Sequence, residues 1–401
     1  MTVPDLPLTI WALPLFTAVV GWATNRLAVL MLFHPIDPVG RPPFLGWQGV
    51  IPRRAEEMAH ECIDRTLARS GDLTGVYQRL DPALITGEVV SRIMPHLEEY
   101  VDDVMYEHHP VLWDNLPRRV KGRIYRYVEH NLPERVDAMV ADFGEELGDL
   151  VDLRALMSEE LREHPDFMNR ILKDAGASTF QFVIRSGAVI GLLLGVALAA
   201  GWTFWSSSWL LLGGGFIVGL LTNWIAITLI FRPREQKQWG PFRIQGLLMR
   251  RQPEISHIWG QRVAHELLTC EKVAHAIVHG EKAGRTRAII QKHLRPLLDQ
   301  STVLRVSTQM AVGASGYTEL KKSMNDRALS ASEEVFRDDA FNNDRARIVA
   351  ELIEERIAGL SPDAFQSLLR PVFAAEEGRL MLAGGVCGLL ATLVPVVLMG
   401  L

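Results

Sequence analysis

The sequence predicts an all-α membrane protein with four transmembrane helices and two long cytoplasmic helical arms. The 401-residue chain is 48% hydrophobic, and its apolar residues are concentrated in four blocks. A membrane-crossing helix needs roughly 17 to 25 mainly apolar residues, and each block is about that long. Long charged segments with helical patterning separate the first block from the second and the third from the fourth. We therefore expect four membrane crossings and two arms outside the membrane.

The elements follow one another in a simple order. The predicted segments are a span at 8–33, an arm at 52–180, a span at 187–204, a span at 209–231, an arm at 250–378 and a span at 380–401. The first block is expected to stay in the membrane rather than act as a cleavable signal peptide. No basic residue precedes it, and no small-residue cleavage site follows it before Arg26.

Each arm is expected to be a series of amphipathic helices. The segments 84–105 and 134–157 place apolar residues at spacings of three and four, as one face of a helix requires. Prolines are expected to divide the first arm into helices; they are Pro82, Pro95, Pro110, Pro117, Pro133 and Pro165.

One pattern is written twice along the chain. TNRLAVLMLFHP begins at Thr24 and TNWIAITLIFRP begins at Thr222, about 198 residues later. A similar offset pairs QGVIPRR at 48 with QGLLMRR at 245, and GAVIGLLL at 187 with GGVCGLLA at 384. We infer a tandem duplication with repeat units 1–205 and 206–401. Each unit crosses the membrane twice, so the copies should be related by an axis along the membrane normal.

The distribution of cations predicts the orientation. Basic residues flank the arm-side ends of the spans, and the opposite ends offer none; those at the arm side are Arg41, Arg53, Arg54, Lys173, Arg185, Arg232, Arg234, Lys237, Arg250, Arg251, Arg370 and Arg379. The positive-inside rule therefore places the arms in the cytoplasm and both termini outside. Trp11, Trp202, Trp205 and Trp209 are then expected to form an outer aromatic belt.

The composition and the motifs exclude several classes of function. The net charge of −5 argues against a nucleic-acid-binding protein, and the three cysteines show neither CxxC spacing nor clustering with histidines. No arrangement resembles a nucleophile with its base, so we expect no enzyme and no cofactor. Membrane lipids, most favourably anionic ones, are the expected partners. A homo-oligomer or a cytoplasmic protein partner stays open.

The repeated intramembrane motifs are the first candidate site, formed by Gly21, Thr24, Asn25, Arg26, Gly219, Thr222 and Asn223. Polar side chains inside a membrane either bridge helices or line a path for a solute or lipid. We favour bridging and predict that Asn25 and Asn223 face each other and bond reciprocally. Arg26 is expected to extend to the headgroups; because its repeat partner is Trp224, a symmetric charged site is excluded.

Two further sets of residues suit membrane contacts. Glycines spaced four apart allow close helix packing; they are Gly187, Gly191, Gly195, Gly384 and Gly388. The short connectors after the first and third spans carry aromatic residues and paired arginines that suit lipid headgroups; these are Phe44, Trp47, Arg53, Arg54, Trp239, Phe242, Arg250 and Arg251. A plain helix start at each arginine pair is the alternative.

An E-x-x-H pattern occurs twice, as Glu57 with His60 and as Glu254 with His257. Two such pairs are half of a ferritin-like di-iron site, which also needs a glutamate from each of two other helices. No repeat-related glutamate pair completes the set. We therefore expect no metal ion, and the four residues are only candidates.

The repeated pattern G-x-x-TN, with the later QG and RR residues and the glycine-rich span, resembles a family of bacterial membrane proteins typified by YheB and YjiN. That resemblance implies a multi-span protein of the inner membrane and supplies no activity. The favoured function is a non-enzymatic scaffold that contacts lipids or organises the cell envelope. A solute or lipid conduit formed by an oligomer is the first alternative, and a metal-dependent enzyme using the E-x-x-H pairs is the second.

Overall fold

The computed structural model describes residues 8–41, 45–66, 72–108, 110–205, 207–235, 237–239, 242–299, 336, 338–374 and 377–398. The described chain is predominantly helical and divides into two compact units. Unit 1 comprises Met1–Cys62, Ser158–Trp259 and Glu354–Leu401, and unit 2 comprises Ile63–Met157 and Gly260–Ile353. Each compact unit therefore combines segments from both halves of the chain, whereas the predicted repeat divides the sequence between residues 205 and 206.

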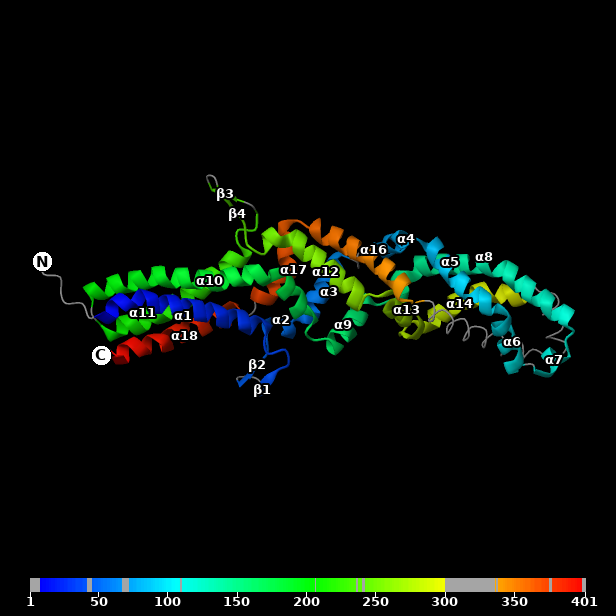
Figure 1. Cartoon of the computed structure of the whole chain (residues 1–401), viewed down its shortest axis with the longest axis horizontal. Coiled ribbons are helices and arrows are strands. Elements are labelled where there is room, and N and C mark those ends of the chain that lie inside the picture. Colours follow the sequence, from blue (N-terminus) through cyan, green and yellow to red (C-terminus); the bar gives the residue numbers. More distant parts are fainter. Residues whose placement is uncertain are drawn as a thin grey trace. The chain divides into compact units, whose positions relative to one another are not determined.

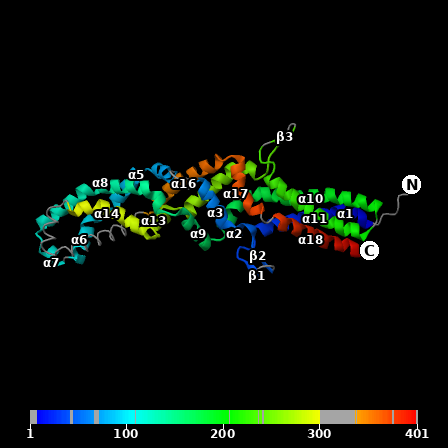
Figure 2. The same ribbon diagram turned by 180° about the vertical axis from the view of Figure 1, so that it is seen from behind.

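Four long apolar helices lie side by side in unit 1 (Figures 1 and 2). They are α1 (Leu8–Phe33), α10 (Phe167–Phe204), α11 (Ser208–Phe231) and α18 (Glu377–Leu398). All four are long and apolar enough to cross a membrane. α1 packs chiefly against α10, and α11 packs chiefly against α18. Four spans were expected, and the structure has four helices suited to that role.

The tryptophans near the far end of this bundle have different surroundings. Trp202 is buried in an apolar cluster with Leu13, Leu198, Leu211 and Val396. Its placement in an outer aromatic belt was therefore wrong, because neighbouring helices cover its ring. Trp205 and Trp209 are largely exposed. The side chain of Trp11 lies outside the described part of the chain.

The second apolar helix begins earlier than expected. Residues 187–204 were predicted as the span and the first arm was predicted to end at 180, whereas α10 is continuous from Phe167 to Phe204. Its first half carries charged residues, but Phe167, Ile171 and Ala175 are buried. Packing of this amphipathic face continues the helix beyond the part that a hydropathy pattern detects.

Shorter elements adjoin the four long helices. They are β1 (Val39–Arg41), β2 (Leu45–Trp47), α2 (Val50–Arg53), α3 (Ala55–Thr66), α9 (Leu153–Glu163), β3 (Lys237–Trp239), β4 (Phe242–Ile244), the 3₁₀ turn η2 (Met249–Arg251), α12 (Gln252–Arg262) and α17 (Pro362–Ala374). β1 pairs antiparallel with β2, and β3 pairs antiparallel with β4. Each connector after α1 and α11 is thus a small hairpin, and the two hairpins project from opposite sides of unit 1 (Figure 1).

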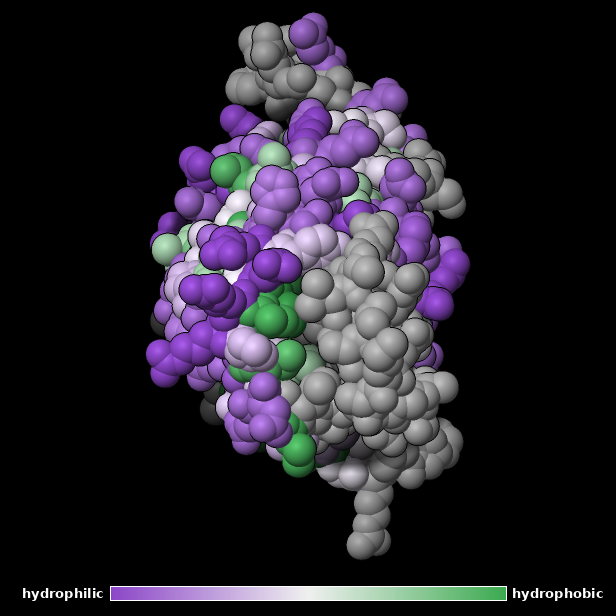
Figure 3. Space-filling model, turned by 90° about the vertical axis from the view of Figure 1, so that its right-hand side faces the viewer, coloured by the Kyte–Doolittle hydropathy of each residue, from purple (hydrophilic) through white to green (hydrophobic). Residues whose placement is uncertain are grey.

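Unit 2 is built from helices of both predicted arms. Its elements include α4 (Asp72–Arg79), α5 (Pro82–Ile93), the 3₁₀ turn η1 (Met94–His96), α6 (Leu97–His108), α7 (Pro110–Asn115), α8 (Arg118–Leu150), the π turn η3 (Val263–Leu267), α13 (Cys270–His279), α14 (Ala283–Asp299) and α16 (Asp339–Ala358). Val89 of α5, Val136 of α8 and Ile290 of α14 pack in one core. Figure 3 views the molecule from the right-hand side of Figure 1, and hydrophilic residues, in purple, predominate among the coloured residues there.

Proline divides the first arm less often than expected. α5 and α7 begin at Pro82 and Pro110, and Pro117 precedes α8. Pro133 instead lies inside α8, so the predicted break there was wrong. An internal proline costs about 3 kcal/mol of helix stability. The neighbouring Leu132 and Val136 are buried in the unit 2 core, and their packing opposes that cost.

Candidate functional site

The amide of Asn25 joins α1 to α10. Asn25 is fully buried, and its Nδ2 donates a hydrogen bond of 2.7 Å to the carbonyl oxygen of Val183. Two glycines bring the backbones close enough for this bond. A Cβ added at Gly187 would lie 2.4 Å from the carbonyl oxygen of Gly21 and 2.6 Å from Asn25 Nδ2. Asn25, Gly21 and Gly187 therefore form one contact, which we name clasp 1.

The same arrangement joins α11 to α18. Asn223 Nδ2 donates a hydrogen bond of 2.7 Å to the carbonyl oxygen of Leu380. A Cβ at Gly384 would lie 2.3 Å from Asn223 Nδ2, and one at Gly219 would lie 2.1 Å from the carbonyl oxygen of Gly384. We name Asn223, Gly219 and Gly384 clasp 2.

The two asparagines do not bond to each other, so the predicted reciprocal amide pair was wrong. Each Nδ2 is already committed to a carbonyl of the adjacent helix. Both side chains line one cavity of about 30 Å³ together with Ala28, Val183 and Leu380. Their Oδ1 atoms are buried without a hydrogen-bond partner. The asparagines thus line a common cavity, and each of them bridges a separate helix pair.

The threonines beside the clasps are satisfied within their own helices. Thr24 Oγ1 donates to the carbonyl oxygen of Gly21 at 3.2 Å, and Thr222 Oγ1 donates to that of Val218 at 2.7 Å. Both side chains are buried. Their hydroxyl donors are therefore committed and not offered to a ligand in the cavity.

The other glycines extend the close contact along each helix pair. A Cβ at Gly191 would lie 2.3 Å from the carbonyl oxygen of Thr17, and one at Gly195 would lie 1.8 Å from Thr17 Oγ1. A Cβ at Gly388 would lie 2.2 Å from the carbonyl oxygen of Gly215. The glycine faces of α10 and α18 thus contact α1 and α11, the helices that carry the asparagines.

Arg26 lies on the outside of α1. Its guanidinium carbon is 5.2 Å from the centre of the Trp22 ring, and both side chains are exposed. Trp224, at the corresponding position of α11, is 49% exposed. A cation stacked on an exposed tryptophan suits the headgroup region of a membrane.

A second pair of polar bridges was not anticipated. Asn169 Nδ2 donates to the carbonyl oxygen of Phe33 at 2.7 Å, and Gln366 Nε2 donates to that of Phe231 at 3.1 Å. These bonds tie the last residues of α1 and α11 to α10 and α17. The signal was available in the sequence, because Asn169 and Gln366 are related by the same offset as the repeated motifs.

The two arginines of each connector pair have different surroundings. Arg54 pairs with Glu57 at 2.7 Å, while Arg251 pairs with Glu254 at 3.2 Å and donates to the carbonyl oxygen of Ala175. The first member of each pair, Arg53 or Arg250, is exposed. Arg53 and Arg250 are thus the more exposed members of the two pairs, and the expected contact of all four arginines with lipid stays a prediction.

The aromatic connector residues are described only in part. Trp47 donates from Nε1 to the carbonyl oxygen of His34 at 3.2 Å. Phe44 lies outside the described residues, as do the side chains of Trp239 and Phe242. Their expected contact with headgroups stays a prediction.

The E-x-x-H residues do not converge on a common point. Glu57 and Glu254 each pair with an arginine. His60 Nε2 lies 2.7 Å from Ser158 Oγ, and His257 Nδ1 lies 2.8 Å from Glu354 Oε2. Each of the four side chains thus has a separate partner, and their arrangement does not favour a shared metal ion.

Two glutamates and a histidine elsewhere in unit 1 are spaced closely enough to hold a metal ion. Glu160, Glu163 and His164 bring one potential ligand atom each within 4.8 Å of one another. Glu163 and His164 are exposed. Exposed acidic groups of this kind are common without a bound ion, so the cluster does not by itself indicate a metal site.

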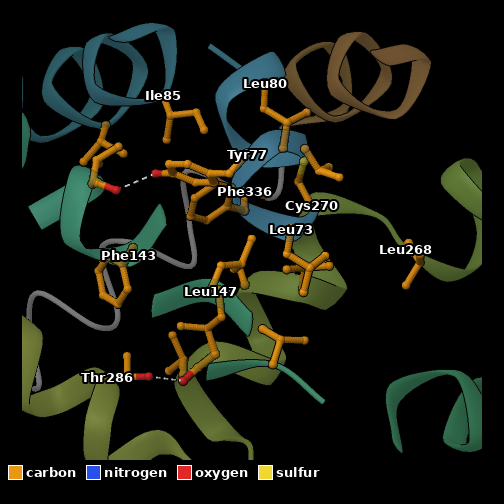
Figure 4. A pocket seen from close by; sticks show the side chains of 18 of the residues that line it. Leu73, Tyr77, Leu80, Ile85, Phe143, Leu147, Leu268, Cys270, Thr286 and Phe336 are labelled. Carbon is orange, nitrogen blue, oxygen red and sulfur yellow. Dashed lines mark hydrogen bonds between the residues drawn. The ribbon is translucent and has the colours of Figure 1, made fainter. Parts of the chain in front are cut away.

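Unit 2 contains a larger cavity of about 210 Å³ (Figure 4). Aliphatic and aromatic side chains from α4, α5, α8, α13 and α14 form most of its wall. The polar groups among them are Tyr77, Thr286 and Cys270. Sequence patterning had indicated that these helices are amphipathic, but it could not show that their apolar faces leave space between them.

Comparison with known proteins gives a distant relative. A UPF0754 protein from Alkalihalophilus pseudofirmus (strain OF4) is 26% identical to the chain over 180 residues, which is 41% of this chain and 45% of the relative. The chain thus matches less than half of that protein's length. UPF0754 designates an uncharacterised family. No family model matches the chain, and no solved structure matches it. The chain is therefore similar to one member of an uncharacterised family, and the finer resemblance to YheB and YjiN stays a prediction.

Proposed function

We propose that the protein is a multi-pass protein of the bacterial inner membrane that acts as a non-enzymatic, lipid-contacting scaffold. Four helices would anchor it, and the two helical arms would lie in the cytoplasm. The observation that best supports a membrane location is the exposed apolar surface of the four long helices. Val19 of α1, Leu193 of α10, Ile217 of α11 and Val397 of α18 are each more than half exposed. Lipid chains would cover such surfaces without an energetic penalty.

The proposed tandem duplication is supported by contacts that occur twice. Clasp 1 and clasp 2 use the same residue types and the same kind of backbone acceptor. Asn169 and Gln366 repeat the pattern at the ends of α1 and α11. A duplicated scaffold of this kind would hold two equivalent helix pairs in one bundle.

Contact with anionic lipid is proposed at the two connectors. Arg53 and Arg250 are exposed at the start of the segments that follow the hairpins. A basic residue near an anionic membrane surface contributes about 1 kcal/mol to the attraction. The full chain in nanodiscs containing phosphatidylglycerol and phosphatidylcholine tests this, with the retained lipids measured by native mass spectrometry.

The matched variants make the lipid test specific. Arg53→Gln with Arg250→Gln should lower the phosphatidylglycerol retained at each connector about five-fold, because about 1 kcal/mol of attraction is lost at each. Arg123→Gln with Arg287→Gln changes two exposed arginines of unit 2 and should leave it unchanged. Equal retention of both lipids by the wild-type protein would contradict the proposed anionic preference.

The oligomeric conduit is the second candidate, and it is favoured by the cavity that both asparagines line. A volume of about 30 Å³ is enough for roughly one water molecule, and each amide donor is committed to a helix contact. These features support the bridging role more strongly than a transport path. Substitution of both asparagines distinguishes the two, as argued in the Discussion.

A further inference from the structure

The wall of the unit 2 cavity is almost entirely hydrocarbon. Leu73 and Leu80 approach from the side of α4, Phe143 and Leu147 from α8, and Phe336 from a separate segment (Figure 4). Several of these side chains are only half-buried. The cavity is therefore accessible from the surface of unit 2 as well as lined by apolar groups.

The few polar groups in the wall do not favour water. Tyr77 donates its hydroxyl to the carbonyl oxygen of Val140 at 2.6 Å, and Thr286 donates to that of Ile277 at 2.6 Å. Burial raises the pKa of the Cys270 thiol to about 11, so the thiol stays neutral at physiological pH. A water molecule needs two to four polar partners to occupy a cavity, and the described residues of this wall offer no uncommitted strong donor.

The size of the cavity suits a hydrocarbon ligand. An engineered apolar cavity of roughly 150 Å³ stays dry and takes up benzene. The unit 2 cavity is larger, at about 210 Å³. A flexible unbranched chain fits a wall of mixed leucine, valine and phenylalanine without requiring a matching rigid shape.

A buried cation lies beside this wall. Arg345 of α16 is 8% exposed, and its Nη1 donates to the carbonyl oxygen of Leu80. Its guanidinium stacks on Phe341 with the central carbon 5.5 Å from the ring centre. Its charge also acts on the thiol of Cys270. Because Leu80 and Cys270 both line the cavity, Arg345 is next to it.

Among the residues that the structure describes, the charge of Arg345 is only partly compensated. Leu80 follows the carboxyl end of α4, where the helix dipole favours a cation. The Nε atom is buried without a hydrogen-bond partner, and no carboxylate of the described chain forms an ion pair with this arginine. A buried charge normally has a partner of opposite sign. An anionic group bound near Arg345 would provide one.

We propose that the unit 2 cavity binds the hydrocarbon chain of a single-chain anionic amphiphile, such as a fatty acid or a lysophospholipid, with its head group near Arg345. The inference rests on the proposed function, because a membrane protein meets such amphiphiles in its own bilayer. It extends that function from contacts along the membrane helices to one lipid chain held within the arms.

Photolabelling of the full chain in nanodiscs tests the proposal. The probes are a diazirine-bearing octanoic acid and the chain-matched diazirine octanol, whose short chains suit a cavity of about 210 Å³. Mass spectrometry locates the labelled peptides. The acid should label peptides that contain Leu73, Phe143 or Cys270 at least several-fold more than the alcohol. Ala274→Phe, which places a ring at the cavity wall, should lower labelling of these peptides by both probes.

Variants of Arg345 distinguish a loss of the positive charge from a loss of folding. Arg345→Gln should abolish the preference for the acid, and Arg345→Lys should restore much of it, because lysine retains the charge. Arg347→Gln alters an exposed arginine of the same helix and should have no effect. Hydrogen exchange of α8 and α14 reports whether unit 2 remains folded in each variant.

The possible outcomes distinguish the inference from the proposed function. Labelling of α1, α10, α11 and α18 without any cavity peptide would overturn the inference and leave the membrane scaffold intact. No labelling of those four helices would contradict the scaffold itself. Equal labelling of the cavity by acid and alcohol would overturn the assignment of an anionic ligand.

Discussion

Asn25 and Asn223 illustrate how a buried polar side chain can hold two apolar helices together. Each amide donates to a backbone carbonyl of the adjacent helix at 2.7 Å. Lipid offers no competing hydrogen bonds, so an unpaired amide would be costly there. The donor is satisfied in both clasps, and the glycine opposite it allows the short distance.

The asparagine clasps predict a loss of stability on substitution. Asn25→Leu or Asn223→Leu should lower the free energy of unfolding by ~0.6 to 2 kcal/mol each, the range for hydrogen bonds between membrane helices. The measurement is unfolding of the purified protein in mixed micelles of mild detergent and SDS. Thr228→Leu is the control, because Thr228 is only partly buried and its hydroxyl donates to the carbonyl oxygen of Trp224 within its own helix. A stable double variant that loses solute flux in proteoliposomes would instead favour the conduit.

The sequence anticipated the residues of the clasps but not their acceptors. Repetition of the asparagine and its upstream glycine indicated where the helices approach. The acceptors are main-chain carbonyls of Val183 and Leu380, and a main-chain group leaves no trace in residue identity. For that reason a reciprocal amide pair looked equally consistent with the sequence, and the structure was needed to exclude it.

At the scale of elements, helix pairs are set by glycine contacts. The backbones of α1 and α10 meet where Gly21 faces Gly187, and those of α11 and α18 meet where Gly219 faces Gly384. A methyl group at these positions would overlap main-chain atoms that cannot rotate away. Gly213, on α11, has no atom within 4 Å of an added Cβ. Alanine substitution at a crossing glycine can therefore be compared with alanine substitution at Gly213, where the added methyl group meets no atom.

Alanine at the crossing glycines should therefore separate the helices. Gly21→Ala and Gly219→Ala are expected to destabilise the protein by ~1 to 3 kcal/mol, the typical cost of overpacking. Gly213→Ala should be close to neutral. The same micelle unfolding assay measures all three. A neutral Gly21→Ala variant would mean that the helices are not as close as this structure has them.

Charge contacts join the two arms within unit 2. Asp142 of α8 accepts hydrogen bonds from Lys292 at 2.6 Å and from His293 at 2.7 Å, both on α14. The Lys292 bond, followed by the His293 bond, lowers the pKa of the Asp142 carboxyl. The unfolded chain therefore binds a proton at a higher pH than the folded one, and stability from this contact is lost as the pH falls through the folded pKa.

Asp142→Asn should destabilise the α8–α14 contact at neutral pH by ~1 kcal/mol, since the side chain is partly exposed and water screens its charge. Hydrogen exchange of α8 and α14 amides, compared with wild type at each pH, measures the effect. The difference should persist from pH 7 to 5 and diminish only below about pH 3.9, the ordinary pKa of aspartate. Glu129→Gln, at an exposed position of α8, should have no effect. A difference that vanishes at pH 5 would contradict the assignment to Asp142.

For the whole molecule, the sequence predicted the four long apolar helices better than the division into compact units. The bounds 8–33 coincide with α1 because apolar residues predominate along the whole block, with few polar interruptions. The second span was placed too late because the first half of α10 is amphipathic, and only its contacts extend the helix to Phe167. The combination of both arms in unit 2 depends on a core that includes Val136 of the first arm and Ile290 of the second. Contacts between residues so distant in sequence are not visible in local periodicity.

The topology of the whole chain gives the final prediction. If each half crosses the membrane twice, both arms lie on the same side, and the cations at the arm-side ends place that side in the cytoplasm. Single cysteines are introduced by Trp205→Cys, Glu129→Cys or Arg287→Cys, at exposed positions, in a background with Cys62, Cys270 and Cys387 replaced by alanine. A membrane-impermeant maleimide should label only the Trp205→Cys protein in intact spheroplasts, and should label all three after lysis. Labelling of both arm positions from outside would invert the proposed orientation. Labelling of one arm alone would exclude two parallel copies, because an even number of crossings per repeat cannot separate the arms.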